Sequence, residues 1–176
     1  MDQNPFIGRR AFGILAVGCL VASALPRVAV AQMDKVHASM AALKGKAAKL
    51  GPPKIEGTDT VAGKDVPALY FGTTKMNNNF DVVDEVVKEN GGVATFFVKA
   101  GDEYVRIATN VKKADGSRAI GTILDPNGPV IAAIRKGAAY YGDAMILGKP
   151  YVTGYDPIRG ASGNVIGIYF VGYLKG

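Results

Sequence analysis

The sequence predicts an α+β fold built around one antiparallel sheet. Residues 93–111 and 149–174 each contain two β-strand patterns joined by a glycine-containing turn, which is typical of a β-hairpin. Separate helical patterns lie before and between these hairpins. Short helices combined with antiparallel hairpins are typical of α+β folds. The length of 176 residues suits a single domain.

The composition favours a folded domain with a mildly basic surface. Hydrophobic residues make up 48 % of the chain, which is enough for a core and argues against general disorder. The formal net charge is +6, but the charges are interspersed and form no dense basic block. This pattern disfavours nucleic-acid binding and weakly favours small anionic ligands.

Residues 1–31 have the organisation of an export signal. Arg9-Arg10 is followed by an apolar run over residues 11–25 and by the A-x-A motif Ala29-Val30-Ala31. We therefore expect a signal peptide that is cleaved after Ala31, which leaves Gln32 as the first mature residue. This predicts a periplasmic protein.

Three alternatives for this segment stay open. The run is shorter than the roughly 20 apolar residues of a membrane span, and it ends at Pro26-Arg27, so a retained anchor is the less favoured alternative. Arg9-Arg10 with Ala11-Phe12 partly resembles a twin-arginine signal, and the general secretory route is the other choice. Cys19 is the one cysteine, and it would be lipidated in a lipoprotein, although the residues before it form a poor lipidation motif.

An amphipathic helix is expected over residues 34–50. Its apolar positions recur at spacings of four and three and form one stripe, composed of Val36, Met40, Leu43, Ala47 and Leu50. The stripe either packs on the domain's own core or forms a dimerisation surface. His37, the one histidine, is interpreted as a surface residue on this helix.

Residues 55–72 are expected to form a loop or weak strand, and the segment after them to form a second helix. Asn77-Asn78-Asn79 introduces this helix, since asparagine is a favoured N-cap, and Gly91-Gly92 ends it. Its inner face is expected to carry Phe80, Val83 and Val87. Its acids, Asp81, Asp84 and Glu85, suit the positive end of the helix dipole better than a metal or catalytic site.

The remaining elements follow from apolar patterns and turn signals. A short helix is expected over residues 129–136, after the turn Asp125-Pro126-Asn127-Gly128. The expected strands are 93–99, 103–111, 140–146, 149–158 and 165–174.

Cationic and phenolic side chains gather in the second half of the chain and predict a binding pocket. The candidate ligand-binding residues are Arg106, Arg118, Tyr141, Lys149, Tyr151, Thr153 and Tyr155. Arginine can clamp a carboxylate through paired N–H donors, and lysine can add a point charge. The alternation at positions 151, 153 and 155 places three hydroxyls on one face of a strand.

Each candidate also has a purely structural interpretation. The tyrosines can be core residues with hydroxyls at the surface, and Arg106 can be a salt-bridge partner. Arg118 and Lys149 can be solvated surface residues. No catalytic motif, metal-ligand set or cofactor motif accompanies them, so we expect a protein without enzymatic activity, metal or cofactor.

A series of short motifs runs in order through the chain. They are NNNF with VD over 77–84, GVATFF at 92–97, VRIATN at 105–110, SRAIGT at 117–122, YG and ILGKPY over 141–151, YDPI at 155–158 and GNVIG at 163–167. In this order and spacing they resemble the single-Cache domains of the Cache 3/Cache 2 fusion type. The resemblance covers roughly Lys54 to Tyr173.

This resemblance implies a PAS-like fold with a central antiparallel sheet of about five strands. It implies a long N-terminal helix on one face, and short helices and loops that cover a small-molecule pocket on the other. The family mostly forms extracytoplasmic sensor modules of chemotaxis receptors, histidine kinases and cyclic-dinucleotide enzymes. The expected division is a signal peptide over 1–31, an N-terminal helix and linker over 32–53 and a single Cache domain over 54–176.

The resulting functional expectation is a free-standing, exported Cache protein that binds a small organic anion such as a carboxylate. Amino acids and purines also suit aromatic and cationic walls. The alternative is an accessory module of a signalling or chemotaxis system that has a vestigial pocket. Such a module would form a homodimer or dock on a membrane receptor.

Overall fold

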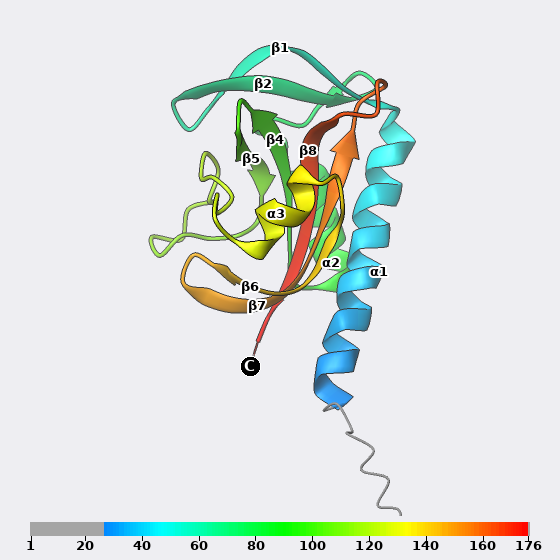
Figure 1. Cartoon of the computed structure of the whole chain (residues 1–176), viewed down its shortest axis with the longest axis vertical. Coiled ribbons are helices and arrows are strands. Elements are labelled where there is room, and N and C mark those ends of the chain that lie inside the picture. The colour runs from blue at the N-terminus through cyan, green and yellow to red at the C-terminus, as the bar shows by residue number, and fades with distance from the viewer. Residues whose placement is uncertain (1–26, 176) are drawn as a thin grey trace, which may run out of the picture.

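The computed structural model describes residues 27–175, and its centre is a five-stranded antiparallel sheet (Figure 1). The strands lie in the spatial order β5-β4-β8-β7-β6. Their bounds are β4 (Val93–Ala100), β5 (Glu103–Thr109), β6 (Tyr140–Ile146), β7 (Lys149–Arg159) and β8 (Val165–Leu174). All five expected strands are therefore present, and the two expected hairpins pair as antiparallel neighbours.

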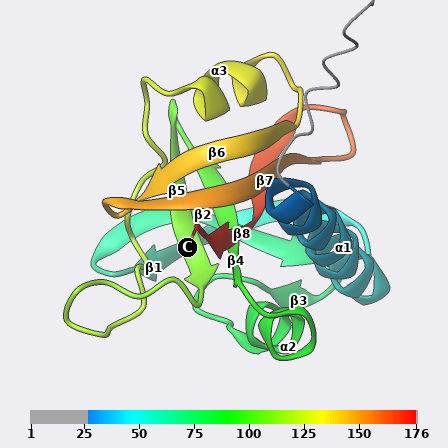
Figure 2. The ribbon, with the colours of Figure 1, turned by 90° about the horizontal axis from the view of Figure 1, so that it is seen from below.

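Helices cover both faces of this sheet (Figure 2). α1 (Arg27–Leu50) and α2 (Asp81–Asn90) lie side by side on one face, where α1 packs on β7 and β8 and α2 packs on β4. α3 (Pro129–Arg135) lies on the opposite face, over β6 and β7. The expected α+β architecture and the placement of the long N-terminal helix are confirmed.

The apolar stripe of α1 packs against the domain's own core. Val36, Met40, Leu43 and Ala47 are buried against the sheet and α2. Gly154 on β7 makes this close approach possible, because a Cβ there would lie 2.9 Å from Val36. The stripe is therefore not free to serve as a dimerisation surface.

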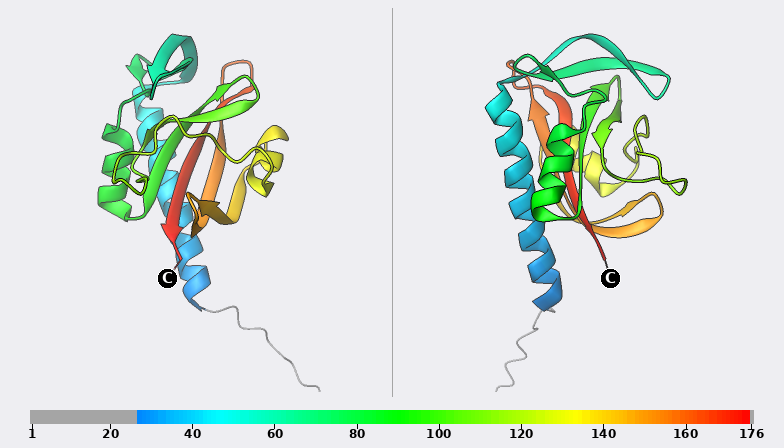
Figure 3. Two further views of the ribbon diagram at one scale, coloured as in Figure 1. Left: turned by 90° about the vertical axis from the view of Figure 1, so that its left-hand side faces the viewer. Right: turned by 180° about the vertical axis from the view of Figure 1, so that it is seen from behind.

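Residues 53–75 form a second, three-stranded sheet, which differs from the expected loop or weak strand. Its strands are β1 (Pro53–Val61), β2 (Lys64–Phe71) and β3 (Thr74–Lys75). Figure 3 shows that this small sheet covers one end of the main sheet, next to the end of α1. The sequence pattern does not reveal β1 because six of its nine residues are exposed and one is buried, so the strand has no apolar alternation to detect.

The second helix begins close to the expected position. The Asn79 side-chain oxygen accepts a hydrogen bond of 3.0 Å from the backbone N–H of Asp81, and Gly91 ends the helix with a φ of 76°. The buried residues of this helix are Val82, Val83 and Val86. Phe80 and Val87, which were expected on the inner face, are only partly buried at its border.

Two separate apolar cores result from this layering. One fills the space between the sheet, α1, α2 and β2, and includes Phe71, Phe96 and Tyr169. The other lies between the sheet and α3, and includes Phe97, Tyr155 and Phe170. The cavity described next opens at the border of this second core.

Candidate ligand-binding site

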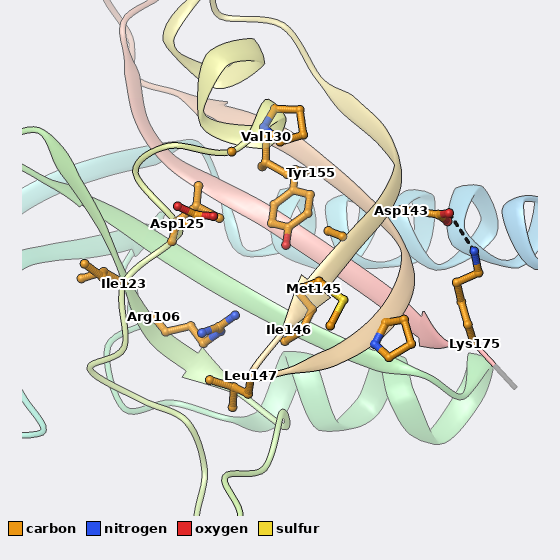
Figure 4. Close-up of a pocket in the computed structure, with 15 residues that line it drawn as sticks. Arg106, Ile123, Asp125, Val130, Asp143, Met145, Ile146, Leu147, Tyr155 and Lys175 are labelled. Atoms are coloured by element: carbon orange, nitrogen blue, oxygen red, sulfur yellow. Dashed lines mark hydrogen bonds and ion pairs between the residues drawn. The ribbon is translucent and has the colours of Figure 1, made fainter.

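A cavity of about 630 Å³ lies on the α3 side of the sheet (Figure 4). Its walls come from β5, the segment between β5 and α3, the start of α3, the β6–β7 hairpin and the end of the chain. The lining residues are Arg106, Ile123, Leu124, Asp125, Gly128, Pro129, Val130, Asp143, Ala144, Met145, Ile146, Leu147, Pro150, Tyr155 and Lys175. This is the side on which short helices and loops were expected to cover a pocket.

Arg106 is the one deeply buried cation of this cavity. Its residue surface is 4 % exposed, and its guanidinium lies 4.8 Å from the centre of the Phe97 ring. Nη1 donates a hydrogen bond of 2.5 Å to the Thr122 hydroxyl, whereas the buried Nε has no partner. Within residues 27–175, none of the ion pairs involves Arg106. Among the described residues, the charge is therefore buried without a counter-charge.

Burial lowers the pKa of the Arg106 guanidinium, and the neighbouring Tyr155 partly opposes this shift. Arginine nevertheless stays protonated, because its ordinary pKa lies far above physiological pH. The site thus presents a permanent positive charge in surroundings that disfavour it. A negative charge next to the guanidinium would offset this cost.

Tyr155 supplies a neutral hydroxyl at the same place. Its ring is buried between Tyr140 and Phe170, with ring centres at 6.3 and 4.8 Å. Burial raises the pKa of the Tyr155 phenol well above its ordinary value, so the hydroxyl keeps its proton and can donate it in a hydrogen bond. Figure 4 shows the hydroxyl of Tyr155 and the guanidinium of Arg106 directed toward the same part of the cavity.

The segment after β5 holds both Arg106 and one wall of the cavity in place. The backbone N–H of Arg106 donates to the Thr122 carbonyl at 2.9 Å, and that of Gly121 donates to the Arg106 carbonyl at 2.8 Å. The N–H of Leu124 donates to the Tyr104 carbonyl at 2.9 Å. The segment therefore covers the edge of β5 like a further strand, and it carries Ile123 and Leu124 into the cavity wall.

Charged groups at the rim are already engaged or solvated. Asp143 and Lys175 form an ion pair at 2.7 Å. Asp125 is exposed, and one of its carboxylate oxygens accepts a hydrogen bond of 2.9 Å from the backbone N–H of Asn127. The rim thus adds no unpaired cation to that of Arg106.

The structure brings two of the seven sequence-predicted residues, Arg106 and Tyr155, together in the cavity wall. Tyr151 and Thr153 share a face of β7 with Tyr155, as the alternation predicted. Tyr151 packs against the core under α3, and the Thr153 hydroxyl donates to the Gly142 carbonyl at 2.7 Å. Lys149 is exposed at the start of β7.

Tyr141 lies on the other face of the sheet. Its ring stacks on His37 of α1, with ring centres 4.4 Å apart. Burial raises the pKa of its phenol, and Asp156 contributes to the same shift. The structure therefore places Tyr141 under α1 and outside the residues that line the cavity.

Arg118 is also directed away from the cavity. Its guanidinium donates two hydrogen bonds of 2.7 Å to the carboxylate of Asp84 and one of 2.8 Å to the Thr109 carbonyl. It stacks 4.3 Å from the centre of the Phe80 ring. The Asp84 carboxylate raises the pKa of Arg118. The interaction ties the segment after β5 to α2, and it gives Asp84 a role beyond the helix dipole.

We expect the Arg118–Asp84 pair to stabilise the fold by about 1 kcal/mol, the upper range for partly exposed pairs, because its geometry is bidentate. Asp84→Asn and Arg118→Gln should each lower the free energy of unfolding in urea by about this amount, and the double variant should show coupling. Asp81→Asn, in the same helical turn, is the matched control. Equal losses in Asp81→Asn and Asp84→Asn would assign the effect to the helix dipole alone.

Sequence reasoning missed the apolar part of the site. Leu147 lies in the turn between β6 and β7, Met145 lies near the end of β6, and Ile123 lies in the segment that pairs with the edge of β5. The one sequence signal is Leu147, a large apolar residue in a turn, where polar residues are favoured.

The profile of the Cache 3/Cache 2 fusion domain matches residues 21–175, nearly the whole chain. The chain belongs to the Cache 3/Cache 2 fusion domain family. A comparison with curated proteins finds no match. Cache domains are typically extracytoplasmic sensors that bind small molecules, and the family is generally non-catalytic. The resemblance identified from the sequence motifs is thereby confirmed.

Two further observations describe this Cache domain. No helix in the described part of the chain is long and apolar enough to cross a membrane. Within the same residues, no group of three or more histidine, cysteine, aspartate or glutamate side chains is arranged to hold a metal ion. The expected signal peptide lies largely outside the described residues. Its expected cleavage point, after Ala31, falls within α1.

Proposed function

We propose that this Cache domain is an exported binding protein that holds a small organic anion on Arg106. The observation that carries the proposal is a buried guanidinium that lines a cavity and lacks a carboxylate partner within residues 27–175. A carboxylate is the simplest group that would complete this site, because its two oxygens match the planar N–H donors of arginine.

The cost of the buried charge supports this assignment. Arg106 loses hydration on burial, and it gains in return one hydrogen bond that it donates to the Thr122 hydroxyl and a ring contact with Phe97. An entering carboxylate would accept hydrogen bonds from the Arg106 guanidinium and from the Tyr155 hydroxyl. Without a ligand, the buried charge of Arg106 is unfavourable, and a bound anion would offset this cost. Binding is therefore selective for negative charge.

Export to the periplasm belongs to the same proposal. Residues 1–31 would act as the signal peptide, residues 32–53 as the N-terminal helix and linker, and residues 54–176 as the main body of the Cache domain. The extracytoplasmic location of Cache domains supports export.

A calorimetric titration of the purified protein with carboxylates, amino acids and purines tests the proposal. We expect saturable binding of at least one carboxylate. Arg106→Gln should weaken this binding by 30-fold or more, since loss of a buried charge-assisted pair costs about 2–5 kcal/mol. Thermal shifts provide a second readout, because a ligand at 100 times its dissociation constant stabilises the native state by about 2.7 kcal/mol.

Lys149→Gln is the matched control, because Lys149 is an exposed cation on the β6–β7 hairpin and is absent from the cavity lining. We expect this variant to bind as tightly as the unmodified protein. The proposal fails if no anion binds. It also fails if the anion that binds is held equally well by Arg106→Gln.

A further inference from the structure

We infer that the anion held by Arg106 is amphiphilic: a monocarboxylate with an apolar body, such as a medium-chain or aromatic acid. This inference rests on the proposed function, since it takes Arg106 as the anchor of the anionic group. It adds that the ligand has an apolar body, which the charge of the site alone does not specify.

The walls that surround the anchor are mainly apolar. Beyond Arg106 and Tyr155, the inner surface is formed by aliphatic side chains, which include Leu124, Val130 and Ile146. A small acid such as acetate would leave most of a 630 Å³ cavity unfilled, because this volume lies in the range of sites for drug-sized ligands. The rest of the ligand must therefore contact hydrocarbon.

Apolar side chains also gather at the mouth of the cavity. Ile123 is 38 % exposed, Met145 is 65 % exposed and Leu147 is 47 % exposed, and all three line the cavity. Figure 4 shows them on the β6–β7 hairpin and on the segment after β5, at the border of the cavity. Single exposed apolar residues are common, but a group around a concave site indicates an apolar partner.

The identity of residue 147 is an independent indication of an apolar ligand. Leu147 occupies the two-residue turn between β6 and β7 with Gly148, and the φ angles of these residues are 48° and 80°. Such a turn favours Asn-Gly, because asparagine tolerates positive φ far better than a bulky apolar residue does. Local backbone geometry therefore does not account for the leucine, whereas its position at the cavity mouth does.

The charges of the lining favour a single anionic group. Arg106 offers one buried positive charge, and the Lys175 ammonium at the rim is paired with Asp143 at 2.7 Å. The carboxylate of Asp125 also lines the cavity. A second carboxylate on the ligand would meet Asp125 or the apolar wall, and both would weaken its binding.

The test is a calorimetric series of acetate, butanoate, hexanoate and octanoate on the purified protein. Affinity should rise about fourfold for each methylene group that is buried. Octanedioate has the same length and a second carboxylate, and it should bind at least tenfold more weakly than octanoate. Octan-1-ol tests whether the tail binds without the anion, and it should also bind at least tenfold more weakly.

Leu147→Asn tests the mouth without removing the anchor. This variant should bind octanoate about fivefold more weakly and acetate unchanged. Its Tm without ligand should be equal to or higher than that of the unmodified protein, because asparagine suits the turn. Leu174→Asn is the matched control, since Leu174 is 52 % exposed and does not line the cavity, and it should bind octanoate normally.

The outcomes separate this inference from the proposed function. A series in which acetate and octanoate bind equally, and in which both need Arg106, would overturn the amphiphilic ligand and leave anion binding intact. Tighter binding of octanedioate than of octanoate would also overturn it. A rising series that Arg106→Gln does not change would instead overturn the proposed function, because the tail alone would drive binding.

Discussion

Arg106→Met is expected to stabilise the unliganded protein and to abolish anion binding. Methionine can fill the space of the side-chain stem and contact the Phe97 ring without a charge to desolvate. Replacing even a buried ion pair by well-packed apolar residues is often neutral or stabilising by about 1–4 kcal/mol. Since Arg106 has no carboxylate partner among the described residues, we expect the free energy of unfolding in urea to rise by an amount in this range. The ligand-induced rise in Tm should disappear in the same variant.

Arg135→Met is the control for this experiment. Arg135 lies at the exposed end of α3, outside the cavity lining, and its replacement should change stability by about 0.5 kcal/mol or less. A clear loss of stability in Arg106→Met would mean that the Thr122 hydrogen bond and the Phe97 contact outweigh the cost of burial. In that case Arg106 would be a structural residue, and the argument for an anionic ligand would lose its basis.

Leu43→Ala is expected to lower the free energy of unfolding by about 2–5 kcal/mol. Leu43 lies in the second half of α1 and is fully buried against the core on that face of the sheet. Its truncation removes buried hydrocarbon and leaves a cavity, and both effects destabilise the native state. Urea unfolding followed by circular dichroism measures the change, and size-exclusion chromatography reports the oligomeric state.

Lys35→Ala is the control on the same helix, because Lys35 is exposed and should tolerate the change within about 0.5 kcal/mol. A small loss for Leu43→Ala would be the contrary result. It would mean that α1 packs loosely on the sheet and is available to a second copy or a receptor. If Leu43→Ala has the same oligomeric state as the unmodified protein and a much lower free energy of unfolding, α1 belongs to the core of the single domain.

The strands and helices of this domain could largely be predicted from local sequence patterns. Strands β4, β5, β7 and β8 have apolar runs or alternation because at least one of their faces is buried, and turns that contain glycine mark where several of them end. The stripe of α1 is visible for the same reason. β1 escaped detection because it is held by backbone pairing with β2 and buries few side chains.

The binding site depended on the tertiary structure. The sequence selected Arg106 and Tyr155 by residue type, but only the arrangement of the strands shows that they share a cavity. The sequence could not show that Arg118 pairs with Asp84, which lies 34 positions earlier, or that Tyr141 faces α1. Periodicity reports which face of an element is apolar, whereas the partner of a charged side chain depends on which distant segments the fold brings into contact.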